Sequence, residues 1–321
     1  MFVQLHDLMI ELHSQDRPIL AQWSRLFAGW LRAEFPGLAD LKLELSWQET
    51  LPPLPSIPPF YNDAGENTAV SPALAVYRGP AESVQLHFHD AGLVTVPLAV
   101  RPDAPGSVAR GTVVPVSILN GRFEDVTVTS LAPLLRRRGY FLLHAFGAVK
   151  EGRAILLVGA SGSGKTTSGL RLLLDGWELL SNDVVLLEAR ADGAYALAMP
   201  DIITIRPFTL QLLPRLREHL AAVTDRPFDV SAETLTNGRW ANPAPITAVY
   251  FPQITGQSTS TAVPLSRAVC LAHLMEQSID QWDTAVFPQH LALLQRLSQQ
   301  AAAYTLRLGQ DLSDLPRLLA G

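Results

Sequence analysis

The chain has 321 residues, of which 48% are hydrophobic and 17% are charged, and its formal net charge is −5. This length is usual for two domains, and the hydrophobic share is large enough for a substantial core, which excludes a disordered chain or a solvated helical rod. The acidic balance and the lack of a long basic block argue against nucleic acid as a partner.

The cysteine content and the N-terminal segment indicate in which cellular compartment the protein lies. Cys270 is the single cysteine, so the chain cannot form an internal disulfide, which is typical of a reducing environment. The first eighteen residues carry acids early and have no long apolar core, so we expect no secretory signal. No apolar stretch approaches the roughly 20 residues of a membrane-spanning helix. We therefore expect a cytoplasmic protein that does not contact a membrane.

The first part of the chain alternates between helical and extended patterns. Apolar residues recur at helical spacing over 14–35, and Pro36-Gly37 predicts the end of that helix. Residues 41–47 alternate between apolar and polar side chains, which indicates a half-buried strand. Prolines crowd residues 51–59, where a stiff connection is favoured over a segment recognised by a partner protein.

A β-rich pattern follows. Residues 83–88 and 93–100 flank a turn, which predicts a hairpin, and residues 113–119 read as a further strand. Residues 125–138 read as a helix that Gly139 terminates.

Strands and helices alternate through the remainder of the chain. Residues 140–144 and 154–158 are apolar and read as strands, residues 166–175 as a helix, and residues 179–188 as one strand. The later predictions are helices at 265–277, 289–302 and 311–319 and a strand at 304–308.

The change of pattern after residue 120 suggests two domains. We assign residues 1–122 to a smaller α+β domain of unknown role. Residues 123–321 are assigned to an α/β domain in which helices cover a sheet.

A glycine-rich loop follows the strand at 154–158. Residues 159–166 read Gly-Ala-Ser-Gly-Ser-Gly-Lys-Thr and match the phosphate-binding pattern G-x-x-x-x-G-K-[ST] fully, with a strand before and a helix after. The glycines let backbone N–H groups surround phosphate oxygens, and the helix adds its positive end. The Lys165 ammonium would reach the β- and γ-phosphates, and the Thr166 hydroxyl would bind Mg²⁺. The expected nucleotide-binding residues are Gly159, Ala160, Ser161, Gly162, Ser163, Gly164, Lys165, Thr166 and Thr167.

Two features at fixed distances from the glycine-rich loop narrow the class of nucleotide-binding protein. His144 lies fifteen residues before Gly159, and Asn182-Asp183 follows Lys165 by seventeen and eighteen residues. The stretch HAFGAVKEGRAILLVGASGSGKTTSGLRLLLDGWELLSNDVV resembles the HPr kinase/phosphorylase family, whose nucleotide site is akin to that of phosphoenolpyruvate carboxykinase. The family pattern is a histidine, a hairpin, the loop, a helix ended by glycine, a short strand and Asp-Asp. It covers about an eighth of the chain.

The resemblance implies a P-loop kinase domain of the HPr kinase C-terminal type. It implies an alcohol-group phosphotransferase with ATP and Mg²⁺, in which Lys165 acts on the phosphates and Asp183 is the general base. His144 would sit beside Asp183, tuning its charge or orienting the acceptor. Thr166, Asn182 and Asp183 would be the metal ligands. A homo-oligomer is implied as well.

The chain departs from the family pattern in three places. Asn182 stands where the family has a first aspartate, Thr166-Thr167 replaces Ser-Glu, and residues 199–208 match the family's substrate-engaging segment poorly. The acceptor therefore stays open among a protein, a peptide and a small hydroxylated molecule, and the choice between ATP and GTP stays open too. Because an amide binds cations more weakly than a carboxylate, the alternative is a nucleotide-binding regulatory or scaffold module with little or no catalysis.

Overall fold

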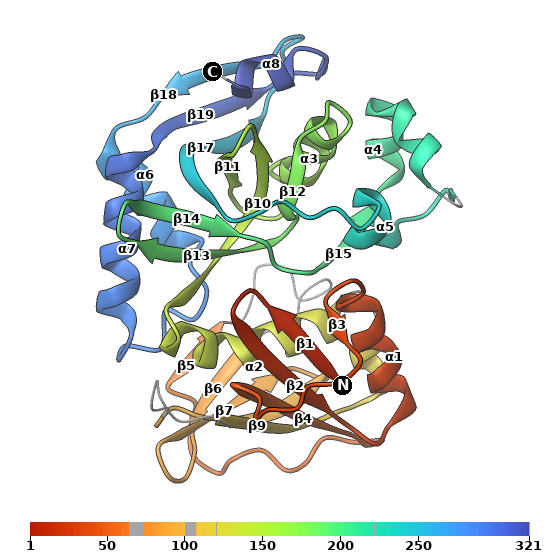
Figure 1. Ribbon diagram of the computed structural model, residues 1–321, viewed down its shortest axis with the longest axis vertical. Helices are drawn as coiled ribbons and strands as arrows, with labels where there is room; N and C mark the ends of the chain where they lie inside the picture. Colours follow the sequence, from red (N-terminus) through yellow and green to blue (C-terminus); the bar gives the residue numbers. More distant parts are fainter. Residues whose placement is uncertain (64–73, 100–106, 120, 221–222, 321) are drawn as a thin grey trace. The chain divides into compact units, whose positions relative to one another are not determined.

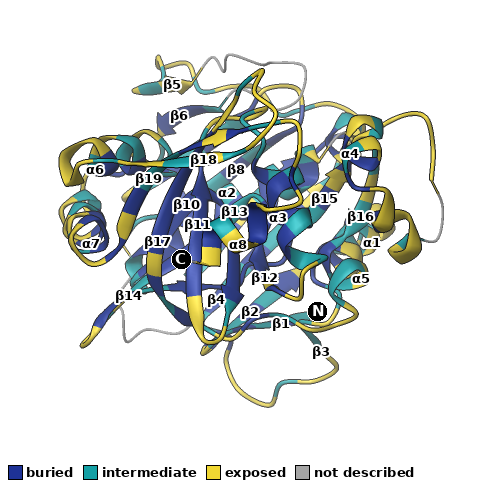
Figure 2. Cartoon of the chain, turned by 90° about the horizontal axis from the view of Figure 1, so that it is seen from above, coloured by how far each residue is buried: buried dark blue, intermediate teal, exposed yellow. Residues whose placement is uncertain are grey.

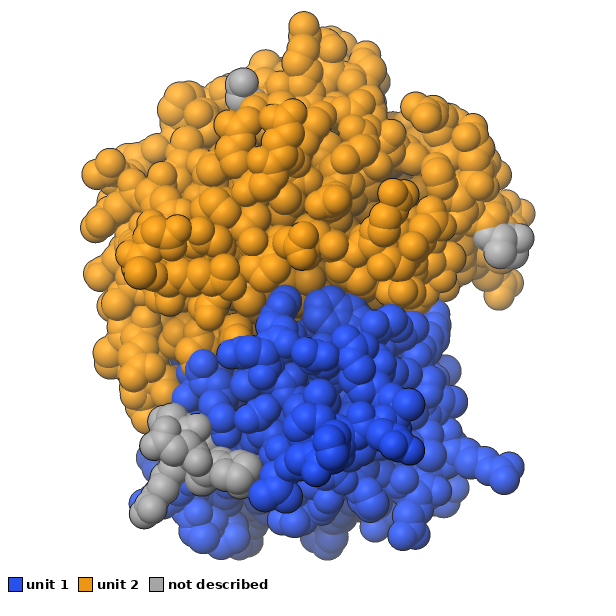
Figure 3. All heavy atoms as spheres, in the orientation of Figure 1, with its two compact units in different colours: residues 1–138 blue, residues 139–321 orange. Residues whose placement is uncertain are grey.

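The computed structural model describes residues 1–63, 74–99, 107–119, 121–220 and 223–320. The chain divides into two compact units, residues 1–138 and residues 139–321, which Figure 3 colours separately. Both units combine helices with extended sheets. Within the described ranges, no helix is at once long enough and apolar enough to cross a lipid bilayer.

The first unit is built on a nine-stranded mixed sheet whose order is β3-β1-β2-β4-β9-β8-β7-β6-β5 (Figure 1). Strands β2, β4 and β9 pair in parallel, and the other neighbours are antiparallel. Its elements are β1 (Phe2–Leu5), β2 (Leu8–His13), α1 (Arg17–Leu26), β3 (Leu31–Arg32), β4 (Leu41–Trp47), β5 (Tyr61–Asp63), β6 (Leu74–Arg78), β7 (Ser83–Phe88), β8 (Gly92–Pro97), β9 (Ser107–Val113), the 3₁₀ helix η1 (Pro115–Ile118) and α2 (Arg122–Arg137).

The predictions for this unit are met in part. The strand at 41–47 and the hairpin of β7 and β8 are confirmed. The helix predicted over 14–35 is shorter, because α1 stops at Leu26 and Leu31 then pairs with Val3 in the sheet. The strand predicted over 113–119 is wrong. Pro115 has no N–H for a sheet ladder, and the chain turns there into η1.

The boundary between the units falls after Arg138, so α2 belongs to the first unit and not to the second. The end of this helix is bound to that unit: Arg137 Nε donates to Leu98 O (2.8 Å), and Arg138 forms an ion pair with Asp40 (3.6 Å). Trp23 Nε1 of α1 donates to Thr127 Oγ1 (3.3 Å). These long-range contacts are absent from the local pattern that suggested a break near residue 122.

The second unit contains a mixed sheet of the order β11-β10-β13-β14-β17-β19-β18, with β12 paired to β10. Its described elements are β10 (Tyr140–Lys150), β11 (Arg153–Val158), α3 (Lys165–Leu173), β12 (Glu178–Ser181), β13 (Val184–Arg190), β14 (Gly193–Leu197), β15 (Ile202–Ile205), α4 (Pro207–Leu212), the 3₁₀ helix η2 (Pro214–His219), β16 (Phe228–Ser231), α5 (Ala232–Thr236), β17 (Ala244–Ile254), β18 (Thr261–Pro264), α6 (Arg267–Glu276), α7 (Phe287–Gln300), β19 (Ala302–Leu308) and α8 (Leu315–Ala320).

Strand β10 is long enough for its two halves to pair with different strands. Its first half pairs with β13 and its second half with β11 and β12. Strand β17 pairs antiparallel with β14 at its start and parallel with β11 further on, so the pairings β10–β13–β14–β17–β11–β10 close a ring. Strand β19 runs parallel to β17 on its other side. Figure 2 colours much of β10, β11 and β17 as buried.

The strand predicted over 179–188 is broken in the structure into β12 and β13. The break falls at Asn182 and Asp183, just after the register of the β10–β12 pairing shifts between Leu179 and Ser181. Two of the candidate site residues therefore lie in a bend between strands.

Candidate functional site

The glycine-rich loop connects β11 to α3. Gly162 and Gly164 have φ angles of +84° and +104°, in the left-handed region that a side chain disfavours. A Cβ atom on Gly164 would also lie 2.6 Å from Leu308 Cδ1, which is closer than carbon atoms can pack. The loop therefore needs glycine at this position for both its backbone angle and its close approach to β19.

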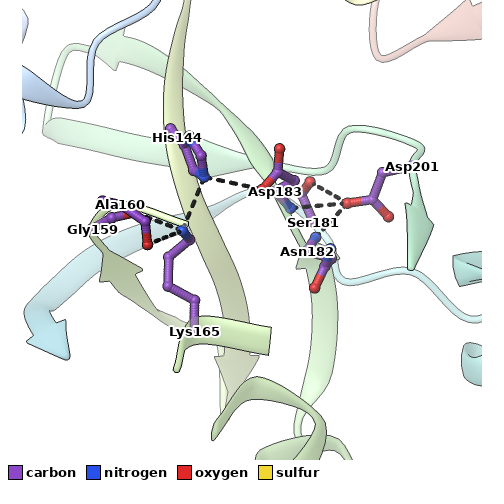
Figure 4. Close-up of polar contacts among 8 residues, drawn as sticks. All are labelled: His144, Gly159, Ala160, Lys165, Ser181, Asn182, Asp183 and Asp201. Atoms are coloured by element: carbon purple, nitrogen blue, oxygen red, sulfur yellow. Dashed lines mark hydrogen bonds and ion pairs between the residues drawn. The ribbon is translucent and has the colours of Figure 1, made fainter. Parts of the chain in front are cut away.

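Lys165 is the first residue of α3 and is only 5% exposed. Its Nζ donates to Gly159 O (2.5 Å) and Ala160 O (3.2 Å) and lies 2.9 Å from His144 Nε2 (Figure 4). Burial lowers the pKa of this ammonium, and the charge of Asp183 only partly opposes that shift. Among the described residues, no carboxylate forms an ion pair with Lys165. A buried cation held by carbonyls at a glycine loop is a fitting partner for a phosphate.

His144 lies on β10, where its backbone N–H donates to Gln277 O (2.9 Å). Its Nε2 lies 3.1 Å from Asp183 Oδ1 as well as 2.9 Å from Lys165 Nζ. One ring nitrogen either carries a proton and donates or has a free lone pair and accepts, so it satisfies one of these neighbours at a time. His144 therefore lies between Lys165 and Asp183 and can form a hydrogen bond with either of them through this one nitrogen.

Asp183 is placed by the break between β12 and β13. Its carbonyl accepts a hydrogen bond from Ala145 N (2.9 Å), and its side chain is 49% exposed. Burial by itself would raise the pKa of the carboxyl group. The hydrogen bond and charge of His144, together with the charge of Lys165, outweigh that effect and hold the pKa below its usual range. Asp183 is thus an ionised, half-exposed carboxylate beside the loop.

Asp201 is a further residue of this region that the sequence did not single out. It is 3% exposed, and its Oδ2 accepts from Ser181 Oγ (2.8 Å), Asn182 N (2.5 Å) and Asp183 N (3.1 Å). These bonds hold the bend that directs Asp183 toward His144. The partners lie 18 to 20 residues before Asp201, so no local pattern could have revealed them.

Burial raises the pKa of Asp201 to about 7, and the nearby charge of Asp183 adds to that effect. The backbone and Ser181 hydrogen bonds oppose the shift but serve only one oxygen. The other oxygen, Oδ1, is buried without a hydrogen-bond partner among the described residues.

The structure gives the expected metal ligands different surroundings. The hydroxyl of Thr166 makes no hydrogen bond among the described residues and is free to bind a cation beside the loop. Asn182 Oδ1 is buried without a hydrogen-bond partner, and in Figure 4 its side chain points away from that of Asp183. The described part of the chain contains no cluster of three or more His, Cys, Asp or Glu side chains able to hold a metal ion. These residues fit Mg²⁺ only if phosphate oxygens supply further ligands, as is usual for this ion.

The remaining loop residues belong to the same surface. Thr167 Oγ1 lies 3.1 Å from Thr209 Oγ1 of α4, so the start of α3 is connected to the segment after β15. Ser161 and Ala160 are exposed, and Ser163 is half-buried. The structure thus brings His144, Lys165 and Asp183 together at the loop, and it leaves Asn182 outside that line.

Similarity to known proteins is found at the level of three-dimensional structure. No protein-family model matches the chain, and no curated protein sequence matches it. Among solved structures, the chain is similar to the structure of the Hpr(Ser) kinase/phosphatase from Coxiella burnetii, with 10% sequence identity and a TM-score of 0.27. The similarity covers 56% of this chain and 90% of that one.

Proposed function

We propose that this chain transfers the terminal phosphoryl group of a nucleoside triphosphate, with ATP and Mg²⁺ as the expected pair, to a hydroxyl group. The observation that carries the proposal is the line from Lys165 through His144 to Asp183, which joins a phosphate-binding loop to an ionised carboxylate. The acceptor, which we take to be a protein, a peptide or a small molecule, would bind in front of Asp183.

Lys165 would begin the reaction by exchanging the carbonyl oxygens of Gly159 and Ala160 for phosphate oxygens. That movement releases His144 Nε2 from the ammonium, so the imidazole can donate to Asp183 and fix its orientation. Mg²⁺, when bound at Thr166 and the phosphates, neutralises part of their charge.

Asp183 would then take the proton of the acceptor hydroxyl. A bond forms between the acceptor oxygen and the γ-phosphorus while the bond from that phosphorus to the β-phosphate oxygen breaks, and the nucleoside diphosphate leaves. Lys165 and the loop N–H groups stabilise the charge that develops on the leaving oxygen. Positioning and electrostatic stabilisation supply most of the rate in this kind of chemistry.

The test is release of ADP from Mg²⁺ and ATP in the presence of a desalted lysate and a panel of hydroxylated acceptors. We expect acceptor-dependent turnover that Lys165→Ala and Asp183→Asn each reduce at least about 100-fold. Asp175→Asn is the matched control, because this acid lies after α3 and pairs with Lys150 away from the site. Asp183→Asn should still bind ATP.

The second candidate is a nucleotide-binding regulatory or scaffold module. It is favoured by one observation, the amide of Asn182 in place of a second carboxylate beside Asp183. Such a module would bind ATP through Lys165, would transfer nothing to any acceptor, and would not respond to Asp183→Asn. Full activity of that variant would therefore overturn the assignment of Asp183 as the base.

A further inference from the structure

Three parallel strands end together beside the glycine loop. Strand β17 runs parallel to both β11 and β19, so their carboxyl ends meet at one edge of the sheet (Figure 1). The segments that leave this edge are the glycine loop, residues 255–260 and residues 309–314. In α/β sheets, ligands bind outside the carboxyl ends of such strands.

The γ-phosphate and the nucleoside of a bound nucleoside triphosphate should lie on different sides of β11. Strand β11, which leads into the loop, has β10 on one side and β17 on the other. His144 and Asp183 occupy the β10 side, so the γ-phosphate end should lie there. The nucleoside must then leave the loop on the side of β17 and β19.

Ile254 lies on that side and is unusually exposed. It is the last residue of β17, pairs with Leu308 of β19, and has 68% of its surface exposed. Its Cγ1 and Cδ1 lie 3.6 and 3.9 Å from the point where a Cβ of Gly164 would be. An apolar surface therefore continues from the loop to solvent, and burying an exposed isoleucine against a ligand is favourable.

The segments around Ile254 are held in place before any ligand binds. Leu308 O accepts from Thr255 N (2.9 Å) and Thr255 Oγ1 (2.8 Å), and Gln310 N donates to Gln257 O (2.9 Å). From α3, Arg171 Nε donates to Leu312 O (3.2 Å), which connects residues 309–314 to the helix that follows the loop. We call Ile254, residues 255–258 and residues 308–310 the shelf. Preorganised surfaces of this kind lose little entropy on binding.

The same shelf exposes polar groups suited to the edges of a base. Gln257 and Gln310 are exposed residues of the two hydrogen-bonded segments that follow β17 and β19. An amide both donates and accepts hydrogen bonds, so it can pair with the ring nitrogens and exocyclic groups of a nucleobase. An apolar face with a few polar groups at its margin is the usual composition of a small-molecule site.

We propose that the shelf formed by Ile254, residues 255–258 and residues 308–310 binds the nucleobase of the nucleotide whose phosphates occupy the glycine loop. The inference rests on the proposed function, because it requires that the loop binds a nucleotide. It adds a recognition site that the loop motif does not contain.

The test compares two ligands that share phosphates and differ in the nucleoside. Binding of Mg²⁺-ATP and of Mg²⁺-tripolyphosphate is measured by calorimetry for the full chain, for Ile254→Ala and for Val269→Ala. Val269 of α6 is the matched control, since it is also an exposed β-branched residue. We expect Ile254→Ala to weaken ATP roughly tenfold and tripolyphosphate less than about twofold, because only ATP loses the contact with the side chain.

Each other outcome has a distinct meaning. Unchanged ATP affinity in Ile254→Ala, with tripolyphosphate still bound, would overturn the base site and leave the proposed function standing. Equal weakening of both ligands would also overturn it, since the effect would then lie in the loop. If the unaltered chain binds neither ligand, the nucleotide-binding assignment itself fails.

Discussion

The shared nitrogen of His144 determines how the candidate base should respond to pH. Its hydrogen bond and charge are what lower the pKa of Asp183 against the effect of burial. Removing the imidazole leaves burial as the larger influence, so the pKa of Asp183 should rise. A base works only while it is deprotonated, and a higher pKa moves the loss of activity to higher pH.

We therefore expect His144→Ala to shift the acidic limb of the kcat/KM profile to higher pH, in addition to lowering its maximum. The measurement is acceptor phosphorylation between pH 4 and pH 9. His273→Ala is the control, because this histidine pairs with Glu276 on the surface of α6. An acidic limb that stays in place after removal of His144 would contradict the role given to it.

Asp201 should make stability depend on pH in the opposite sense to an ordinary salt-bridged acid. Its pKa is raised by burial to about 7 in the folded chain, above the ~3.9 of an unfolded one. The folded state therefore binds more protons between these values, and stability that is present at low pH is lost as the pH rises through about 7.

The variant Asp201→Asn cannot titrate but keeps an oxygen that accepts hydrogen bonds. Relative to this variant, the unaltered chain should lose stability between about pH 4 and pH 7 and change little above pH 7, measured as the difference in free energy of unfolding in urea. Ser181→Ala removes one hydrogen bond to Asp201 without removing the carboxyl group, and it should preserve the pH dependence. A difference that is constant over this range would refute the raised pKa.

These residues also mark the limit of what the sequence could predict of the site. His144, Lys165 and Asp183 could be predicted as candidates because the first and last lie at fixed distances from a loop with its own local pattern. Asp201 acts through partners 18 to 20 residues away, and nothing in its neighbourhood distinguishes it from a surface acid. Contacts that form only when the chain folds leave no periodic pattern and no fixed spacing in the sequence.

At the scale of single elements, the position of α3 depends on how closely it approaches β10. A Cβ on Gly169 would lie 2.2 Å from Phe146 Cε2, and both residues are buried, so neither can move into solvent. Gly169→Ala should therefore displace the helix or the ring and destabilise the chain by roughly 1–3 kcal/mol, even though alanine is the better helix former.

Shortening the side chain opposite Gly169 should relieve this clash. Phe146→Leu shortens the opposing side chain, so Gly169→Ala should cost less in that background than in the unaltered chain, a coupling that a double-mutant cycle of urea unfolding measures. Gly256→Ala is the control, since no atom lies within 4 Å of a Cβ at that glycine. Strict additivity of the Gly169 and Phe146 substitutions would show that the two residues do not conflict.

Elements with strong local signals were predicted best. Strand β4 and the helices α3, α6 and α7 lie within two residues of their predicted bounds, because periodicity and glycine stops define them locally. The hairpin of β1 and β2 was missed, and the break between β12 and β13 was read as continuous strand. The two strands of this hairpin also pair with β3 and β4, and β12 and β13 each pair with β10, and a local pattern contains none of these contacts.

At the scale of the whole molecule, the second unit has a core of its own. A cluster of buried side chains that includes Phe146, Leu170, Tyr250 and Leu306 is made up only of residues between 146 and 319. It joins β10, α3, β17 and β19, which are the elements that place the loop and the shelf. A unit with its own hydrophobic core is expected to fold independently.

We therefore expect residues 139–321, expressed alone, to unfold cooperatively and to bind Mg²⁺-ATP. Binding to the folded state alone stabilises it by about 2.7 kcal/mol when the ligand exceeds its Kd 100-fold, which is readily seen as a rise in Tm. The fragment carrying Lys165→Ala should keep its cooperative transition and lose the shift, which separates ligand binding from folding. A fragment without a cooperative transition would contradict the independent core. A cooperative fragment without a shift would contradict the expectation that residues 139–321 suffice to bind the nucleotide.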